Sequence, residues 1–194
     1  MLDYQTLKRR AAAYQTAPFF ALPYSRSASV LFALHQQQKD WNVVLTTRSQ
    51  HLTHHSGEVA FPGGIIEAGE SAEEAALRES WEEIALPPTH VEVVRPLSSL
   101  VSKWGVHVTS ILGVIDSLPP LTANPDEIDQ IFSVPMSHFV SANISGTTRS
   151  RHRERVVAVP EYHYQGHRIW GMTSYIITDV AKQLFDSDIN FKEI

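Results

Sequence analysis

Residues 64–86 read GIIEAGESAEEAALRESWEEIAL, and they contain a helix whose two ends are both marked. Ser71, followed three residues later by Glu74, forms a capping box, in which each side chain accepts a hydrogen bond from the other residue's backbone N–H. Pro87 and Pro88 stop a helix that reaches them. The pattern therefore predicts a helix from Ser71 to about Ala85.

The residues of this helix divide into two stripes about its axis. At about 100° per residue, the apolar side chains of Leu77, Trp81 and Ile84 share one stripe, which we expect to face the core. The nearly opposite stripe carries three acids: Glu79, Glu82 and Glu83. These acids can meet in space because they are three and four residues apart.

Three glutamates so close repel one another, and a cation placed among them would reverse the sign of that energy. Carboxylate oxygens suit magnesium and manganese. Glutamates on a helix are more often only a solvated face, which is the alternative interpretation. The surroundings favour a metal site, because a Phe61–Gly64 turn precedes the helix and Glu70 and Arg78 accompany the acids.

The stretch resembles the Nudix box of the Nudix hydrolase family. The matching positions are Gly64, Glu70, Arg78, Glu79, Glu82 and Glu83. Two positions depart from the pattern: Ala85 stands where the family usually has glycine, and Ser80 where it usually has an aliphatic residue. Neither departure touches the metal chemistry, so both concern the packing and the end of the helix.

The resemblance implies a role for each residue and a divalent cofactor, Mg²⁺ or Mn²⁺. Glu79 and Glu83 would be the principal metal ligands, Glu82 a further ligand or a carboxylate acting through water, and the Gly63 carbonyl would complete the shell. Arg78 would hold the carboxylates by ion pairs. Glu70 would orient that arginine or share in handling the nucleophilic water.

A second resemblance points to the substrate. Residues 45–49 (LTTRS), Gly57 and residues 61–64 (FPGG) are similar to the motif that precedes the Nudix box in coenzyme A pyrophosphatases, and residues 124–127 (NPDE) and 170–173 (WGMT) also resemble that subfamily. It implies substrate contacts by Arg48, Phe61 and Gly64. The reaction implied is hydrolysis of coenzyme A, or a derivative of it, to 3′-phospho-AMP and 4′-phosphopantetheine.

The chain departs from this motif at Thr53, where the subfamily has an arginine, and His54 and His55 could replace an arginine only in part. Glu127 is a candidate extra metal ligand or general base, or else an exposed loop carboxylate.

Arg149, Arg151, Arg153 and Arg155 alternate, so on one strand they would share a face. That row could bind the 3′-phosphate of coenzyme A, chiefly through Arg151 and Arg153. The commoner alternative is an edge strand protected by charge.

The rest of the chain predicts strands mixed with helices. We expect strand pairs at residues 28–35 with 42–48, 91–101 with 106–116, and 153–159 with 167–170, and a short strand at 130–134. Further helices are expected at 4–16, 135–142 and 172–185. The fold class is therefore α/β (α+β), and the resemblance implies a Nudix-like α/β/α sandwich with a mixed β-sheet. Residues 1–27 are interpreted as a helix and extended leader, and 28–194 as the Nudix hydrolase domain.

Composition narrows the function classes. The chain has 194 residues, a net charge of −5 and no cysteine, which excludes disulfides and gives no support to nucleic-acid binding. We expect a soluble, cytoplasmic protein without a membrane partner, either monomer or homodimer. Two alternatives stay open: a Nudix diphosphatase for another dinucleotide or sugar nucleotide, and a catalytically silent Nudix binding or regulatory module.

Overall fold

The computed structural model describes residues 2–16, 24–52, 55–102, 104–141, 144–152, 155–189 and 192–193. The helices are α1 (Tyr4–Ala12), α2 (Ala72–Ile84), the short 3-10 helix η1 (Pro88–His90), α3 (Met136–Val140) and α4 (Gly171–Phe185). The strands are β1 (Arg26–Gln37), β2 (Asp40–Arg48), β3 (Val59–Ala60), β4 (Gly63–Ile65), β5 (Glu92–Val101), β6 (Val106–Ile115), β7 (Ile128–Pro135), β8 (Ile144–His152), β9 (Arg155–Tyr164), β10 (His167–Ile169) and β11 (Lys192–Glu193).

The described strands form a larger and a smaller sheet. The larger sheet has the order β3-β2-β1-β6-β5, with β4 also paired to β1 and β7 to β2. β1 and β6 run parallel, whereas the other described pairs are antiparallel, so this sheet is mixed as predicted. In the smaller sheet β9 pairs with β8, β10 and β11.

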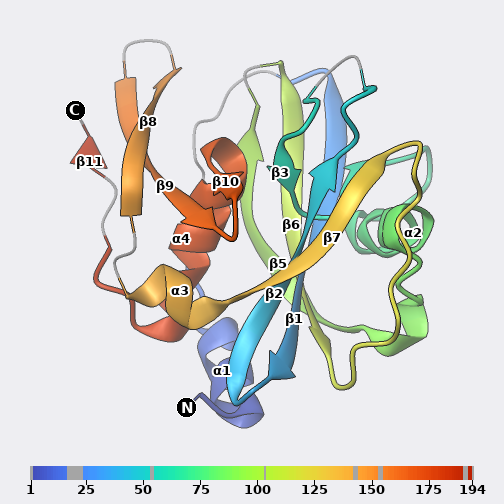
Figure 1. The fold of residues 1–194 in the computed structure, drawn as a ribbon, viewed down its shortest axis with the longest axis horizontal. Helices are drawn as coiled ribbons and strands as arrows, with labels where there is room; N and C mark the ends of the chain where they lie inside the picture. Colours follow the sequence, from blue (N-terminus) through green and yellow to red (C-terminus); the bar gives the residue numbers. More distant parts are fainter. Residues whose placement is uncertain are drawn as a thin grey trace.

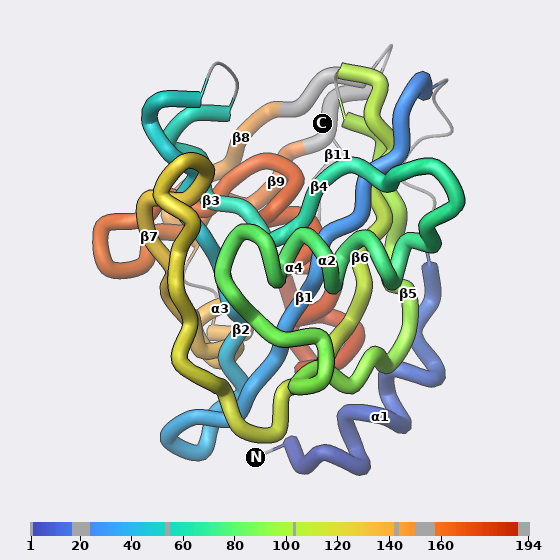
Figure 2. The backbone as a smooth tube through the Cα atoms, turned by 90° about the vertical axis from the view of Figure 1, so that its right-hand side faces the viewer, coloured from blue at the N-terminus to red at the C-terminus, as the bar shows by residue number. Residues whose placement is uncertain are grey.

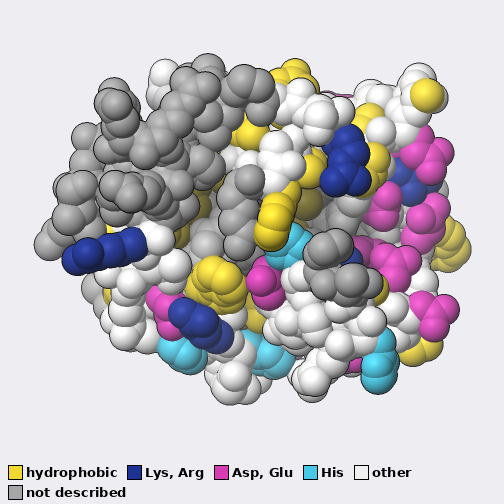
Figure 3. Space-filling model, turned by 90° about the horizontal axis from the view of Figure 1, so that it is seen from above, with side chains coloured by type: hydrophobic (Ala, Val, Ile, Leu, Met, Phe, Trp, Pro, Cys, Tyr) yellow, Lys and Arg dark blue, Asp and Glu magenta, His cyan; other side chains and the backbone are white. Residues whose placement is uncertain are grey.

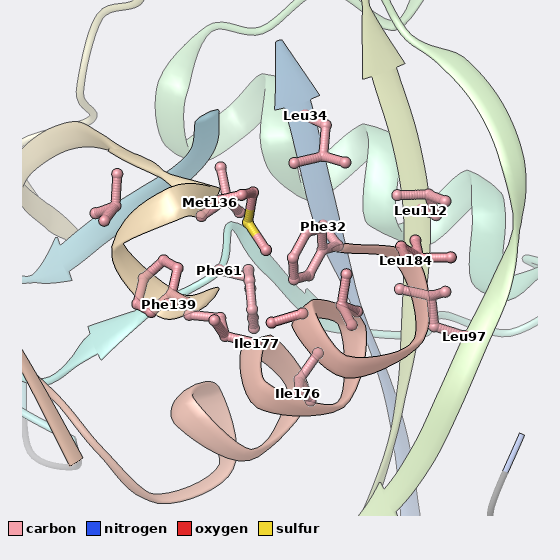
Figure 4. Packing of buried hydrophobic residues seen from close by; sticks show 14 of the residues in the cluster. Phe32, Leu34, Phe61, Leu97, Leu112, Met136, Phe139, Ile176, Ile177 and Leu184 are labelled. Carbon is pink, nitrogen blue, oxygen red and sulfur yellow. The ribbon is translucent and has the colours of Figure 1, made fainter. Parts of the chain in front are cut away.

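Helices cover both faces of the larger sheet (Figure 1). β1 is apolar on both of its faces, as a strand buried between two layers must be. Phe32 and Leu34 belong to the core cluster that includes α4, and Leu31 and Ala33 belong to the cluster that includes α2. Figure 4 shows the first cluster, with side chains of β1 pointing toward those of α4. The predicted α/β/α sandwich is confirmed.

The N-terminal helix is part of this core. Leu7, Ala11 and Tyr14 are buried within the α4-side cluster. α1 ends at Ala12, earlier than the predicted residue 16. The division of the chain at residues 27 and 28 stays a prediction. None of the described helices has the length and apolarity that crossing a membrane requires.

The expected strand at 153–159 is only half of a longer hairpin. β8 and β9 pair antiparallel, from Ile144 opposite Tyr162 to His152 opposite Arg155, and β8 was not predicted. The idea that four alternating arginines share one strand is therefore wrong, because Arg149 and Arg151 lie on β8 and Arg155 on β9. Arg153 and the side chain of Arg151 lie outside the described part of the structure.

The α2 helix turns a different face to the core from the one predicted. Its capping box is present, with the Ser71 side chain accepting from the Glu74 N–H and the reverse bond also formed. However, Trp81 is 51% exposed, so its assignment to the core is wrong. Ile84 is buried as predicted, and Ala76 and Ser80 are buried in place of Trp81; their spacing of four residues places the three on one face. Small side chains at 76 and 80 let the helix approach the sheet closely.

Candidate active site

Two glycines bring the backbone of β4 against the acids of α2. The Gly63 N–H donates a hydrogen bond to Glu83 Oε2 at 2.9 Å. A Cβ on Gly64 would lie 2.4 Å from the Glu79 carboxyl carbon, and one on Gly63 would lie 2.3 Å from the Ser29 carbonyl oxygen. Any side chain at these positions would therefore displace a carboxylate or a strand, which explains the glycine pair.

Glu83 is the most buried of the acids. Its side chain is 2% exposed, and the Arg48 guanidinium lies 3.5 Å from its other oxygen. Burial raises the pKa of Glu83 to about 7, although the Gly63 N–H and Arg48 act in the opposite direction. The negative charges of Glu127 and Glu79 raise this pKa further. The hydrogen bond from Gly63 and the charge of Arg48 therefore do not compensate for the burial of the Glu83 carboxylate.

Glu79 shares this electrostatic environment. Burial raises the pKa of Glu79, Arg78 lowers it, and the charges of Glu82 and Glu127 raise it. Figure 3 shows Asp and Glu side chains gathered on the side of the molecule where α2 lies, with basic side chains between them. The predicted helix acids therefore share one region, and Glu127 acts on both Glu79 and Glu83.

A bulge in the β2–β7 pairing brings Glu127 and Arg48 to this region. Thr47 lies opposite Gln130, but Arg48 lies opposite Ile128, so Asp129 is an extra residue on β7. The next contact is the Ser49 N–H, which donates to the Glu127 carbonyl at 2.8 Å. No sequence pattern singled out Asp129, because a bulge depends on how two distant strands pair.

The Arg78 side chain donates hydrogen bonds to four residues. Its guanidinium donates two bonds to Glu70, at 2.8 and 3.1 Å, and one each to Glu79 at 3.0 Å, Glu82 at 3.2 Å and the Ile65 carbonyl at 3.1 Å. Glu70 and Glu79 raise the pKa of Arg78, and Arg78 lowers the pKa of Glu70. The guanidinium therefore connects the loop before α2 to the acids on the helix.

The oxygen atoms of these acids are the ligand type that a hard divalent cation prefers, but the side chains are not arranged around a single ion site. Among the described residues, no three His, Asp or Glu side chains are grouped so that they could hold one ion together. Arg78 engages Glu79 and Glu82, while Gly63 and Arg48 engage Glu83. The available ligands are nevertheless all oxygens, and burial together with neighbouring negative charges raises the pKa of Glu79 and of Glu83. A divalent ion among them would relieve that repulsion.

The predicted substrate residues do not all lie at this site. Arg48 does, with 26% of its side chain exposed. Phe61 is 4% exposed and packs on Phe32 with ring centroids 5.1 Å apart, so its predicted contact with substrate is corrected to a place in the core. Gly64 lacks a side chain, which lets the Glu79 carboxylate lie against its backbone. Thr53 and His54 lie outside the described residues, and the His55 ring nitrogen Nδ1 is hydrogen-bonded to Glu58 at 2.7 Å.

Known proteins share both the sequence and the fold. The NUDIX domain family matches residues 23–156. A protein of Escherichia coli (strain K12) named "Uncharacterized Nudix hydrolase NudL" is 36% identical over 160 residues, which cover 82% of this chain and 83% of the relative. The protein of the same name from Photorhabdus laumondii is 37% identical over 161 residues, covering 82% and 86%.

Solved structures agree at the level of the fold. A MutT/nudix family protein from Enterococcus faecalis superposes with a TM-score of 0.54 at 18% identity, covering 95% of this chain and 70% of that one. The Nudix hydrolase RenU from M. smegmatis gives a TM-score of 0.51 at 19% identity, covering 58% and 72%. With glutamates of α2 gathered beside the glycines of β4, and with this similarity across most of its length, the chain belongs to the NUDIX domain family.

Proposed function

We propose that this Nudix hydrolase cleaves the diphosphate of coenzyme A, or of a derivative, to 3′-phospho-AMP and 4′-phosphopantetheine. The observation that carries the proposal is the placement of two buried acids against the glycine pair: Glu83 accepts from the Gly63 N–H, Glu79 lies against Gly64, and the charge of Glu127 raises the pKa of both acids. Coenzyme A is favoured by the resemblance of residues 45–49 and 61–64 to the coenzyme A pyrophosphatase motif.

Glu79 and Glu83, helped by Glu82 and the Gly63 carbonyl, would hold Mg²⁺ or Mn²⁺. A bound divalent ion shields a diphosphate, polarises its P–O bonds and acidifies water. Arg78 keeps the acids in place through its bonds to Glu70, Glu79 and Glu82. Glu70 acts through Arg78 as a positioning residue.

Two residues brought in by the bulge complete the proposal. Arg48 reaches Glu83 from the end of β2 and is still partly exposed, so its guanidinium can also donate to a substrate phosphate. Glu127 lies immediately before β7, close enough to raise the pKa of Glu79 and Glu83. Glu127 is the proposed general base, which takes a proton from the attacking water.

The proposal is tested by incubating the protein with coenzyme A and Mg²⁺ or Mn²⁺ and separating the products. We expect 3′-phospho-AMP and 4′-phosphopantetheine, and a loss of at least about a hundredfold in turnover for Glu83→Gln. Glu73→Gln is the matched control, because Glu73 is an exposed acid in the first turn of the same helix. Equal activity in both variants would remove Glu83 from the mechanism.

Substrate choice is tested in the same assay. Turnover of dinucleotides or sugar nucleotides, with coenzyme A left intact, would assign the chain to the alternative diphosphatase. Absence of turnover with every substrate and either metal would leave a binding or regulatory module. That outcome would contradict the proposal, in which the acids of α2 serve hydrolysis.

A further inference from the structure

A histidine and a glutamate form a hydrogen-bonded pair in the turn between β2 and β3. The His55 ring nitrogen Nδ1 lies 2.7 Å from Glu58 Oε2, and because an ionised carboxylate only accepts, the ring is the donor. Both side chains are partly exposed, His55 by 44% and Glu58 by 37%. The contact fixes the orientation of the ring. Its other nitrogen, Nε2, points away from the carboxylate and can contact a ligand.

This pair lies beside the acids of α2, because Glu58 is the neighbour of Arg48 across the β2–β3 pairing. Thr47 lies opposite Val59 in that pairing. The next residue of each segment is then also opposite, and the Arg48 N–H donates to the Glu58 carbonyl at 3.0 Å. Opposite residues of an antiparallel pair place their side chains on the same face, about 5 Å apart at Cβ. The Arg48 guanidinium on that face lies 3.5 Å from Glu83, so Glu58 and the ring bound to it adjoin the candidate active site.

Hydrogen bonds fasten the turn to its neighbours. The Gly57 N–H donates to the Arg48 carbonyl at 3.0 Å, and the Ser56 hydroxyl donates to the Gln50 carbonyl at 2.9 Å. The Gln50 N–H in turn donates to Asp129, the extra residue of the β7 bulge, at 3.2 Å. Figure 2 shows the chain between β2 and β3 beside the start of β7. A side chain held in place before binding loses less freedom when a ligand arrives.

Together with Arg48, the pair provides donors for an anion. The Arg48 guanidinium is 26% exposed and can donate to a ligand as well as to Glu83. With Nδ1–H bonded to Glu58, Nε2–H can donate to a second acceptor, and the carboxylate balances the positive charge of a ring that carries both protons. Phosphate accepts from charged donors of this kind in short, strong hydrogen bonds. The alternative is a purely local contact, which contributes little to stability when it is exposed.

We propose that the His55–Glu58 pair, together with Arg48, binds a phosphate group of the substrate, with His55 Nε2–H donating to a phosphate oxygen. The inference rests on the proposed function for the identity of that substrate. Coenzyme A has two sources of such a group, its 3′-phosphate and the diphosphate itself. Glu58 is a positioning residue, because it orients the ring and does not touch the phosphate.

Replacing His55 by asparagine separates phosphate binding from a local contact. Asparagine keeps a donor for Glu58 at the position of Nδ1, tolerates the φ of 58° at this residue, and lacks Nε2. We expect His55→Asn to lower kcat/KM for coenzyme A about tenfold. His90→Asn, at an exposed histidine of η1, is the matched control and should change nothing. A purely local contact predicts that His55→Asn is as active as wild type.

The same assay with 3′-dephospho-coenzyme A identifies the phosphate. If His55 binds the 3′-phosphate, His55→Asn should leave kcat/KM for this substrate unchanged. If His55 binds the diphosphate, both substrates should lose about the same factor. Wild-type kcat/KM for His55→Asn with both substrates would overturn the inference.

A double variant tests the positioning role of Glu58. In Glu58→Gln the amide oxygen still accepts from Nδ1–H but no longer balances a positive ring, so we expect kcat/KM for coenzyme A to fall about threefold. Because Glu58 acts only through His55, the double variant should be no worse than His55→Asn alone. Losses that multiply in the double variant would contradict this role.

Binding of 3′-phospho-AMP with Mg²⁺ present, measured by calorimetry or NMR titration, separates this inference from the proposed function. We expect wild type to bind it, and His55→Asn to bind it about tenfold more weakly. If coenzyme A is not hydrolysed but this difference holds, the proposed function fails and the phosphate site stands. If wild type does not bind 3′-phospho-AMP, or if His55→Asn binds it equally well, the phosphate site is overturned.

Discussion

Glu83 is an acid that the proposed function needs, in a buried position that lowers the stability of the fold. Its carboxylate is 2% exposed, and burial raises its pKa from the ordinary 4.5 to about 7. One backbone N–H and one guanidinium at 3.5 Å do not compensate for the loss of water. A neutral side chain at this position would favour stability, and the proposed cation would offset the energy that the buried acid costs.

This conflict predicts a dependence of stability on pH. Between the unfolded pKa near 4.5 and the folded pKa of about 7, the folded state holds more protons, so the free energy of unfolding falls as pH rises through that window. In a chelator at pH 8, Glu83→Gln should therefore be more stable than wild type by on the order of 2–3 kcal/mol, and the difference should shrink below pH 5. Urea unfolding at both pH values measures it.

Magnesium provides the control for that prediction. Because a cation bound only by the folded state stabilises it, added Mg²⁺ should raise the urea midpoint of wild type and not that of Glu83→Gln. A wild type that is already the more stable protein at pH 8 without metal would contradict the account of Glu83.

The two ends of the α2 helix fix the position of the acids that it carries. The capping box fixes its first turn, and Ala85, in the left-handed conformation with φ of 53°, ends it. Leu86 is buried beyond that point, and its N–H bonds to the Ser80 carbonyl at 3.3 Å. The Asn124 N–H then bonds to the Glu83 carbonyl at 2.8 Å, which holds the loop before β7 against the helix.

Ala85 is strained where the family usually has glycine. The left-handed conformation costs a residue with a Cβ roughly 1–2 kcal/mol, and glycine avoids this cost. Glycine offsets part of the benefit, because it loses more backbone entropy on folding. Ala85→Gly should therefore raise the free energy of unfolding by roughly 0.5–1 kcal/mol, measured by urea unfolding. Glu73→Gly, inside the same helix, should lower it by about 1 kcal/mol. Destabilisation by both substitutions would show that Ala85 is not strained.

A buried polar group of three residues links the segment just after the N-terminal helix to β5 and α4. The Tyr14 hydroxyl donates to Asp179 on α4, and Ser98 on β5 donates to the same carboxylate oxygen at 2.9 Å. Asp179 is 8% exposed. Burial and the charge of Asp179 raise the pKa of Tyr14, so the hydroxyl stays a donor at neutral pH. The chain end is thereby fastened to both the sheet and α4.

Removing the Tyr14 hydrogen bond should lower the free energy of unfolding and leave activity unchanged. Tyr14→Phe deletes one bond to a buried carboxylate and should lower the free energy of unfolding by roughly 1.5–3 kcal/mol. Tyr24→Phe is the matched control, because Tyr24 is 56% exposed and should change little. Thermal unfolding and kcat, measured on both variants, check the prediction. A fall in kcat for folded Tyr14→Phe would mean that the cluster also supports the active site.

What could be predicted from the residues was local. The cap at Ser71, the helix that follows it, and the spacing of Glu79 and Glu83 depend on neighbours within four positions, and hydrogen-bond geometry decides them wherever the helix sits. The mixed sheet followed from the order of apolar segments along the chain.

Folding settled what depends on contacts between distant segments. The choice of Ala76 and Ser80 over Trp81 as partners of Ile84 on the buried face depended on how closely α2 can approach the sheet. Glu127 and Arg48 reach Glu83 because of a bulge between strands about eighty residues apart in the chain. Short-range patterns cannot encode such a pairing, since its energy exists only once both strands lie in one sheet.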